Sequence, residues 1–100
     1  MFVNTALRTK PLENQEEIFL ENIRNGDAKA FESMFRQYYQ RMFRYAFSIL
    51  KKSDEAEDLV QQVFVNFWEK RELTIISGSL KNYLFRSVHN QCLNQIKHEK

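Results

Sequence analysis

The chain has 100 residues, of which 43% are hydrophobic and 14% aromatic, which is enough for one compact core and too little for two ordinary domains. Two glycines and one proline are too few turn residues for a many-stranded sheet, so we expect an all-α fold. The net charge of +2 neither demands nor excludes a nucleic-acid partner. No apolar run approaches the ~20 residues that cross a bilayer, no signal-peptide pattern opens the sequence, and one cysteine cannot form a disulfide within the chain, so we expect a cytoplasmic protein without membrane insertion.

Capping and turn residues divide the chain into about four expected helices that form one compact bundle. Residues 1–11 are expected to form a flexible N-terminal tail, and residues 12–100 the helical domain. The first helix follows Pro11, with Asn14 as its candidate N-cap, and it stops at the Asn-Gly pair that ends in Gly26.

The second helical stretch starts at Asp27, a candidate N-cap, and is either one long amphipathic helix or two in tandem. Its apolar residues recur at intervals of three and four, which indicates a helix with one buried side. They are Phe31, Phe35, Tyr38, Met42, Tyr45 and Ile49.

The third expected helix runs from Ser53, a candidate N-cap, to about Arg71, and it has two distinct faces. A stripe typical of a buried core consists of Ala56, Leu59, Val60, Val63 and Phe67. The opposite stripe is acidic, amide and aromatic, and consists of Asp54, Asp58, Gln61, Val65 and Trp68, bordered by Phe64. This second stripe suits a protein interface, in which Trp68 anchors a partner and the acids select a basic surface. Alternatively, the acids satisfy the helix dipole and Trp68 folds back into the core.

The last expected helix follows a loop over residues 72–79, is capped by Ser79 and runs towards Lys97. Its core stripe consists of Leu80, Leu84, Val88, Cys92 and Ile96. The residues away from that stripe are basic, amide or aromatic, and they are Lys81, Asn82, Tyr83, Arg86, Asn90 and Lys97. Such side chains suit single-stranded nucleic acid, because cations attract phosphates, amides pair with free base edges and rings stack on bases. The alternative is an ordinary solvated polar face.

The charge of these last two segments differs in sign. Six acidic and two basic residues give residues 53–72 a net charge of −4, while four basic residues and one acidic residue give residues 80–100 a net charge of +3. Adjacent helices of opposite charge suggest two different partners.

Two motifs in this order carry a family resemblance: SDEAEDLVQQVFVNFW at residues 53–68 and LKNYLFRSVHN at residues 80–90. They resemble region 2 of the extracytoplasmic-function (ECF) group of bacterial RNA polymerase sigma factors, and residues 26–39 look like the start of that domain. The family's C-terminal helix-turn-helix domain has no counterpart before Lys100, so we expect the chain to be a fragment of a longer factor.

The resemblance implies a transcription initiation factor domain that binds core RNA polymerase and recognises and melts the minus-ten promoter element. It implies that the acidic helix binds the coiled-coil clamp of the beta-prime subunit through Asp58, Gln61, Phe64, Val65 and Trp68; the helical stripe adds Asp54 as a polymerase-binding candidate. It implies that the loop and the last helix capture the single-stranded non-template strand through Lys81, Asn82, Tyr83, Arg86 and Asn90; the helical pattern adds Lys97 as a DNA-binding candidate. An anti-sigma factor that masks the acidic helix is a further partner implied by the resemblance.

Catalysis is not expected from this sequence. His89 and Cys92 lie one helical turn apart, but two ligands do not make a closed zinc site, and no Gly-rich phosphate loop or nucleophile set is evident. We therefore expect no catalytic residue, no metal and no cofactor. The alternative function is a helical protein–protein interaction module that uses the Trp68 stripe without binding nucleic acid.

Overall fold

A computed structural model describes residues 11–99, and the surroundings of the side chains of residues 15–98. Four helices follow one another, α2 (Pro11–Arg24), α3 (Ala28–Leu50), α4 (Ser53–Glu69) and α5 (Leu80–Glu99). The described part contains no strand, and the predicted all-α fold of about four helices is confirmed. The predicted tail lies outside the described residues, apart from Pro11, which is the first residue of α2.

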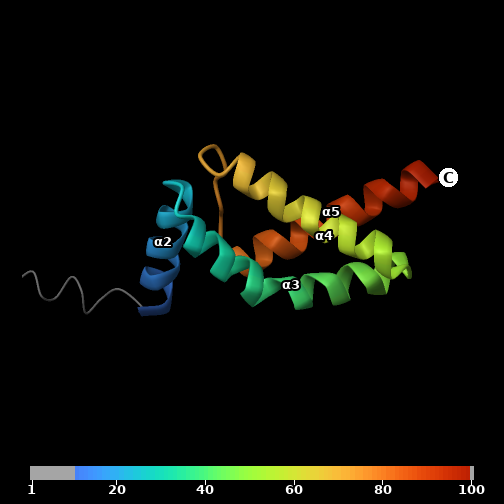
Figure 1. Ribbon diagram of the computed structural model, residues 1–100, viewed down its shortest axis with the longest axis horizontal. Coiled ribbons are helices and arrows are strands. Elements are labelled where there is room, and N and C mark those ends of the chain that lie inside the picture. The colour runs from blue at the N-terminus through green and yellow to red at the C-terminus, as the bar shows by residue number, and fades with distance from the viewer. Residues whose placement is uncertain (1–10, 100) are drawn as a thin grey trace, which may run out of the picture.

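Helix α3 is central to the arrangement, because α2, α4 and α5 all pack against it. Helix α4 returns beside α3 after a short turn, and α5 crosses behind this pair (Figure 1). Helix α2 lies at the end of the bundle where the loop between α4 and α5 and the start of α5 are also found (Figure 1). No described helix is long and apolar enough to span a membrane.

The N-terminus of α3 is capped as the sequence predicts. The Asp27 carboxylate accepts hydrogen bonds from the backbone N–H groups of Lys29 and Ala30, at 3.0 and 3.2 Å. Gly26, with φ of 94°, supplies the left-handed turn between α2 and α3. The second stretch is one continuous helix rather than two in tandem, and it ends at Lys51 in the left-handed conformation.

Two predicted caps are wrong, and both helices begin earlier than the patterns suggested. Helix α2 starts at Pro11, so Asn14 lies inside it; proline suits a first turn because its missing N–H would have no partner there. Helix α4 starts at Ser53, so Lys52 is the N-cap residue, and it makes no side-chain capping hydrogen bond. Helix α4 also ends at Glu69, two residues before the predicted Arg71.

The core is a single cluster of side chains from all four helices. Its buried members are Ile23, Met34, Tyr38, Met42, Ala46, Leu50, Ala56, Leu59, Val60, Val63, Phe64, Phe67, Leu80, Leu84, Val88 and Cys92. The predicted stripes of α4 and α5 are buried, with Ile96 only partly covered. On α3 the buried residues instead recur every four positions, and the predicted Phe31, Phe35, Tyr45 and Ile49 flank them half-buried, because three helices surround α3 rather than one.

Candidate functional site

The outward side of α4 carries the residues predicted to bind a protein partner. Asp54, Asp58, Gln61 and Val65 are exposed, and Trp68 is half-buried at the end of the same row. We call these five residues the α4 face. Asp54 and Glu55 lie in the first turn of the helix, where negative charge is favourable.

Phe64 does not belong to this face. Its side chain is 1% exposed and packs against the rings of Phe31 and Phe35 of α3, with centroid distances of 6.4 and 4.9 Å. A side chain at this depth cannot touch a partner while the domain is folded. Phe64 is therefore a core residue, and we leave it out of the α4 face.

Trp68 combines the two roles that the sequence left open. Its ring packs against Phe31 at a centroid distance of 4.8 Å, as a residue folded back onto α3 would, and yet it stays half-exposed. Arg71 lies over the indole at 4.1 Å and donates a hydrogen bond from Nη1 to the backbone oxygen of Trp68 at 2.8 Å. The sequence patterns did not predict a role for Arg71, because its contact with Trp68 depends on the backbone conformation just after the end of α4.

Tyr39 of α3 extends the surface beside α4, and sequence reasoning missed it. Burial raises the pKa of its hydroxyl, and the nearby carboxylate of Glu57 raises that pKa further, against the opposite effect of a hydrogen bond from Gln61. The tyrosine is also part of a row of stacked rings along α3, formed by Phe35, Tyr39, Phe43 and Phe47. Both observations place an aromatic strip next to the acidic residues.

The loop between α4 and α5 is closed by local hydrogen bonds at each end. The Thr74 hydroxyl donates to the backbone oxygen of Lys70 at 2.8 Å, and the Ser79 hydroxyl accepts from the N–H of Asn82 at 3.1 Å. The predicted Ser79 cap is thus confirmed. Between these ends, Leu73 and Ile75 are 83% and 89% exposed, which leaves two large apolar side chains open to solvent.

A surface pocket of about 240 Å³ lies where this loop meets α5. It is lined by Ile75, Ser77, Asn82, Tyr83, Arg86, Ser87 and Asn90. We call it the loop pocket. Four of the six residues predicted to bind DNA line it, whereas Lys81 and Lys97 do not. Lys81 precedes Asn82 by about 100° around the helix, and Lys97 lies about 16 Å further along it than Arg86.

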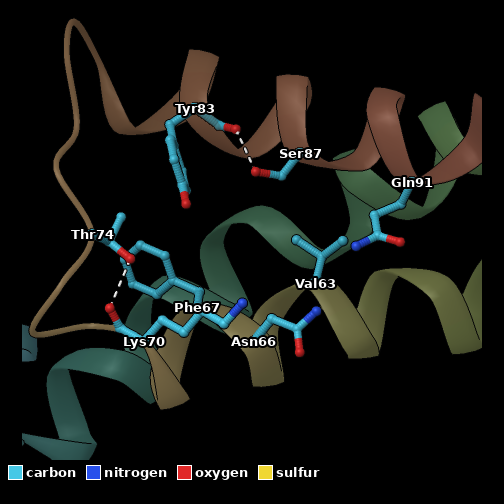
Figure 2. A pocket seen from close by; sticks show the side chains of 8 residues that line it. All are labelled: Val63, Asn66, Phe67, Lys70, Thr74, Tyr83, Ser87 and Gln91. Carbon is cyan, nitrogen blue, oxygen red and sulfur yellow. Dashed lines mark hydrogen bonds between the residues drawn. The ribbon is translucent and has the colours of Figure 1, made fainter. Parts of the chain in front are cut away.

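Tyr83 also borders a second pocket, of about 190 Å³, between α4 and α5. Figure 2 shows its side chain reaching from α5 towards Phe67, and the two rings meet edge to face at 5.9 Å. The Ser87 hydroxyl donates to the backbone oxygen of Tyr83 at 3.0 Å (Figure 2). Asn66, Lys70 and Gln91 add polar groups to this pocket, and none of them was a predicted site residue.

The described residues contain no group of three or more His, Cys, Asp or Glu side chains that could hold a metal ion. His89 has a different partner, because its Nδ1 lies 2.9 Å from the hydroxyl of Tyr45 on α3. Cys92 is fully buried, and burial raises the pKa of its thiol.

The family model described as sigma-70 region 2 matches residues 34–100. The chain is 22% identical over 81 residues to ECF RNA polymerase sigma factor SigW of Bacillus subtilis, which covers 81% of this chain and 43% of that protein. It is 25% identical over 75 residues to ECF RNA polymerase sigma factor SigM of Mycobacterium tuberculosis, covering 75% of this chain and 38% of that protein. The chain therefore spans less than half the length of these curated relatives, and no solved structure gives a significant match.

Proposed function

The chain belongs to the sigma-70 region 2 family, and on that premise we propose that it docks on core RNA polymerase and captures single-stranded promoter DNA. Members of this family are transcription initiation factors and not enzymes, in agreement with the prediction that the chain is not catalytic. The observation that carries the DNA half of the proposal is the loop pocket, which brings together Asn82, Tyr83, Arg86 and Asn90. A role with core polymerase places its site of action in the cytoplasm.

The α4 face is the proposed contact with the polymerase, and the partner is the basic coiled-coil clamp of the beta-prime subunit. Asp54 and Asp58 supply exposed negative charge, and Gln61 adds an exposed amide between them and the apolar end. Val65 and the exposed part of Trp68 supply apolar area. This combination of a charged rim and an aromatic anchor is typical of protein interfaces.

The loop pocket is the proposed receptor for a base flipped out of the minus-ten element. Asn82 and Asn90 carry amides that can pair with a free base edge, and the Tyr83 ring and the exposed Ile75 offer apolar contact. Arg86 at its rim suits a phosphate, and Lys81 and Lys97 extend the basic surface along α5. Flipping a base costs a few kcal/mol, which contacts made only to the flipped base can offset.

Promoter opening tests the proposal, using holoenzyme reconstituted from core polymerase and the full-length factor, with permanganate to detect unpaired thymines. We expect Lys81→Ala with Arg86→Ala to reduce opening on every promoter and to flatten its salt dependence, because phosphate contacts do not depend on sequence. Asn82→Ala should change the preferred minus-ten sequence and leave the salt slope nearly intact.

The matched control removes two arginines from α3, Arg36→Ala with Arg44→Ala, both exposed in the structure. If the two double variants open promoters equally well and Asn82→Ala leaves sequence preference unchanged, the DNA-capture assignment is wrong. The chain would then be better described as a protein-interaction module that uses only the α4 face.

An anti-sigma factor is a second proposed partner, because the α4 face combines exposed acids with an aromatic anchor that a regulatory protein can mask. Such a protein should co-purify with the chain from its native host and compete with core polymerase. Simultaneous binding of both partners to the α4 face would rule out masking.

A further inference from the structure

Helix α2 makes a direct contact with the start of α5. The Glu16 carboxylate accepts a hydrogen bond through Oε2 from the backbone N–H of Leu80 at 2.9 Å, across 64 positions of the chain. Leu80 is the first residue of α5 and is 1% exposed, so its N–H has little access to water. A buried N–H of this kind needs a partner from the protein, and Glu16 provides it.

The contact also supplies a charge that α5 lacks. The first turn of α5 contains no acidic residue, although the N-terminus of a helix favours negative charge, and it contains Lys81. The Ser79 hydroxyl accepts a hydrogen bond from the backbone N–H of Asn82, whereas the backbone N–H of Leu80 donates to Glu16. The two acceptors therefore share the capping of α5, one from the loop and one from α2.

Helix α2 also packs against the core. Ile23 is buried, and the Glu16 carboxylate lies close enough to Tyr38 to contribute, after burial, to a raised pKa of the tyrosine hydroxyl. A cavity of about 340 Å³ is lined by Gln15, Glu16, Phe19, Ser33, Gln37, Tyr38 and Leu80. Glu16 thus joins α2, which packs against α3, to the beginning of α5.

The turn after α2 lies close to the other end of the loop. A side-chain carbon added at Gly26 would lie 3.8 Å from Nη2 of Arg71, the residue that covers Trp68 where α4 ends. The segment from Arg71 to Leu80 is therefore bordered by α2 or its turn at both ends. Between these points lie Ile75 and Ser77, which line the loop pocket.

We propose that Glu16 is a positioning residue for the loop pocket, acting by fixing the point at which the loop enters α5. The inference rests on the proposed function and adds to it a residue outside the region matched by the family model, which begins at residue 34. Without the contact, the start of α5 and the loop residues Ile75, Ser77 and Asn82 would no longer hold one arrangement. The expected consequence is weaker and less selective capture of the opened strand.

Amide hydrogen exchange on the chain tests the positioning role without any DNA. Glu16→Gln keeps an acceptor and loses the charge, whereas Glu16→Ala loses both, and Glu17→Ala is the matched control at an exposed neighbouring position. We expect exchange at Leu80 and in residues 73–79 to increase in the order wild type, Gln, Ala, with Glu17→Ala equal to wild type. Unchanged exchange at these sites, or an equal increase throughout the chain, would overturn the proposal.

Promoter opening then tests the consequence in the holoenzyme. We expect Glu16→Ala to lower the opened fraction by about two- to five-fold, as the loss of one favourable charge at a helix N-terminus suggests, while its affinity for core polymerase stays at the wild-type value. Discrimination among minus-ten sequences should fall as well. Equal opening by Glu16→Ala and Glu17→Ala would contradict the inference, whereas failure of the wild-type holoenzyme to open promoters would contradict the proposed function itself.

Discussion

Trp68 is held from two sides while part of its ring remains exposed. Phe31 packs against it from α3, and the guanidinium of Arg71 lies over the ring at 4.1 Å. A ring already fixed in this way loses little conformational freedom when a partner covers the rest of it. Val65, 46% exposed on the same face, adds apolar area beside this rigid anchor.

Asp58 offers a clean test of docking, because it is exposed and is not part of the core. We expect Asp58→Arg to weaken binding to core polymerase by about 2 kcal/mol, since it would place a positive charge opposite the basic clamp that we propose as the partner. Competition with a labelled wild-type chain measures the change, and circular dichroism checks that the variant is folded. Glu17→Arg on α2 is the control for charge alone, and equal loss of affinity in both variants would argue against the α4 face.

The neighbours Phe64 and Val65 show which residue roles the sequence could predict. The helical period places them 100° apart, with Val65 in the middle of the acidic and aromatic stripe and Phe64 at its border. The pattern identified Val65 correctly as outward-facing. It could not show that Phe64 turns inward, because that depends on Phe31 and Phe35 of α3, which approach it only in the folded bundle.

At the scale of helices, the ends that local chemistry defines were predictable. Asp27 and Ser79 cap their helices with hydrogen bonds to N–H groups two or three residues away, so the signal lies within one turn of sequence. Ser53 looked like a similar cap, but the helix includes it. The acids of the following turn satisfy the dipole, and the Asp54 carboxylate accepts from the N–H of Glu55 at 2.9 Å.

Because Asp27 caps its helix and Ser53 does not, replacing each by alanine should lower the free energy of unfolding by different amounts. Asp27→Ala removes two observed hydrogen bonds and should lower the free energy of unfolding by about 1 kcal/mol. Ser53→Ala removes no capping bond and should change it by less than about 0.5 kcal/mol. Urea denaturation followed by circular dichroism compares the two. Equal losses would show that α4 begins at a Ser53 cap after all.

The shape of the loop between α4 and α5 could not be predicted from the sequence. Its first turn uses a local bond from Thr74 to Lys70, but its exit depends on Glu16, 64 residues before Leu80. Periodicity and capping rules describe neighbours within a few residues and carry no information about such a contact. The residue types of the pocket were therefore predictable, while the pocket itself was not.

The surfaces proposed for the polymerase and for promoter DNA lie on different elements of the molecule, because the α4 face is on α4 and the loop pocket is lined by the loop and α5. The second pocket, which shares Tyr83 and Ser87 with the loop pocket, also lies away from the α4 face. At 100° per residue, its α4 residues Asn66 and Lys70 lie roughly 120–160° around the helix from the middle of that face. The core stripe of α4 lies beside that pocket and binds the helix to α3 and α5. On the proposed function, the polymerase and promoter DNA therefore do not compete for one surface and can be bound at the same time.

Because Cys92 is completely buried, the reactivity of its thiol reports unfolding of the helical bundle. The only thiol in the sequence is 0% exposed, and burial raises its pKa, so little of the reactive thiolate exists or is accessible while the bundle is closed. We expect Ellman's reagent at neutral pH to label the native chain on the order of a thousand-fold more slowly than a peptide of residues 88–96. The labelling rate should rise with urea in parallel with the unfolding equilibrium, and labelling of the native chain at the peptide's rate would contradict a closed core around α5. Because the native thiol does not react, a second cysteine introduced at Ile75 or at Val65 can carry a fluorophore without background labelling of Cys92. The fluorescence of each variant then reports contact at one surface, the loop pocket or the α4 face, in real time.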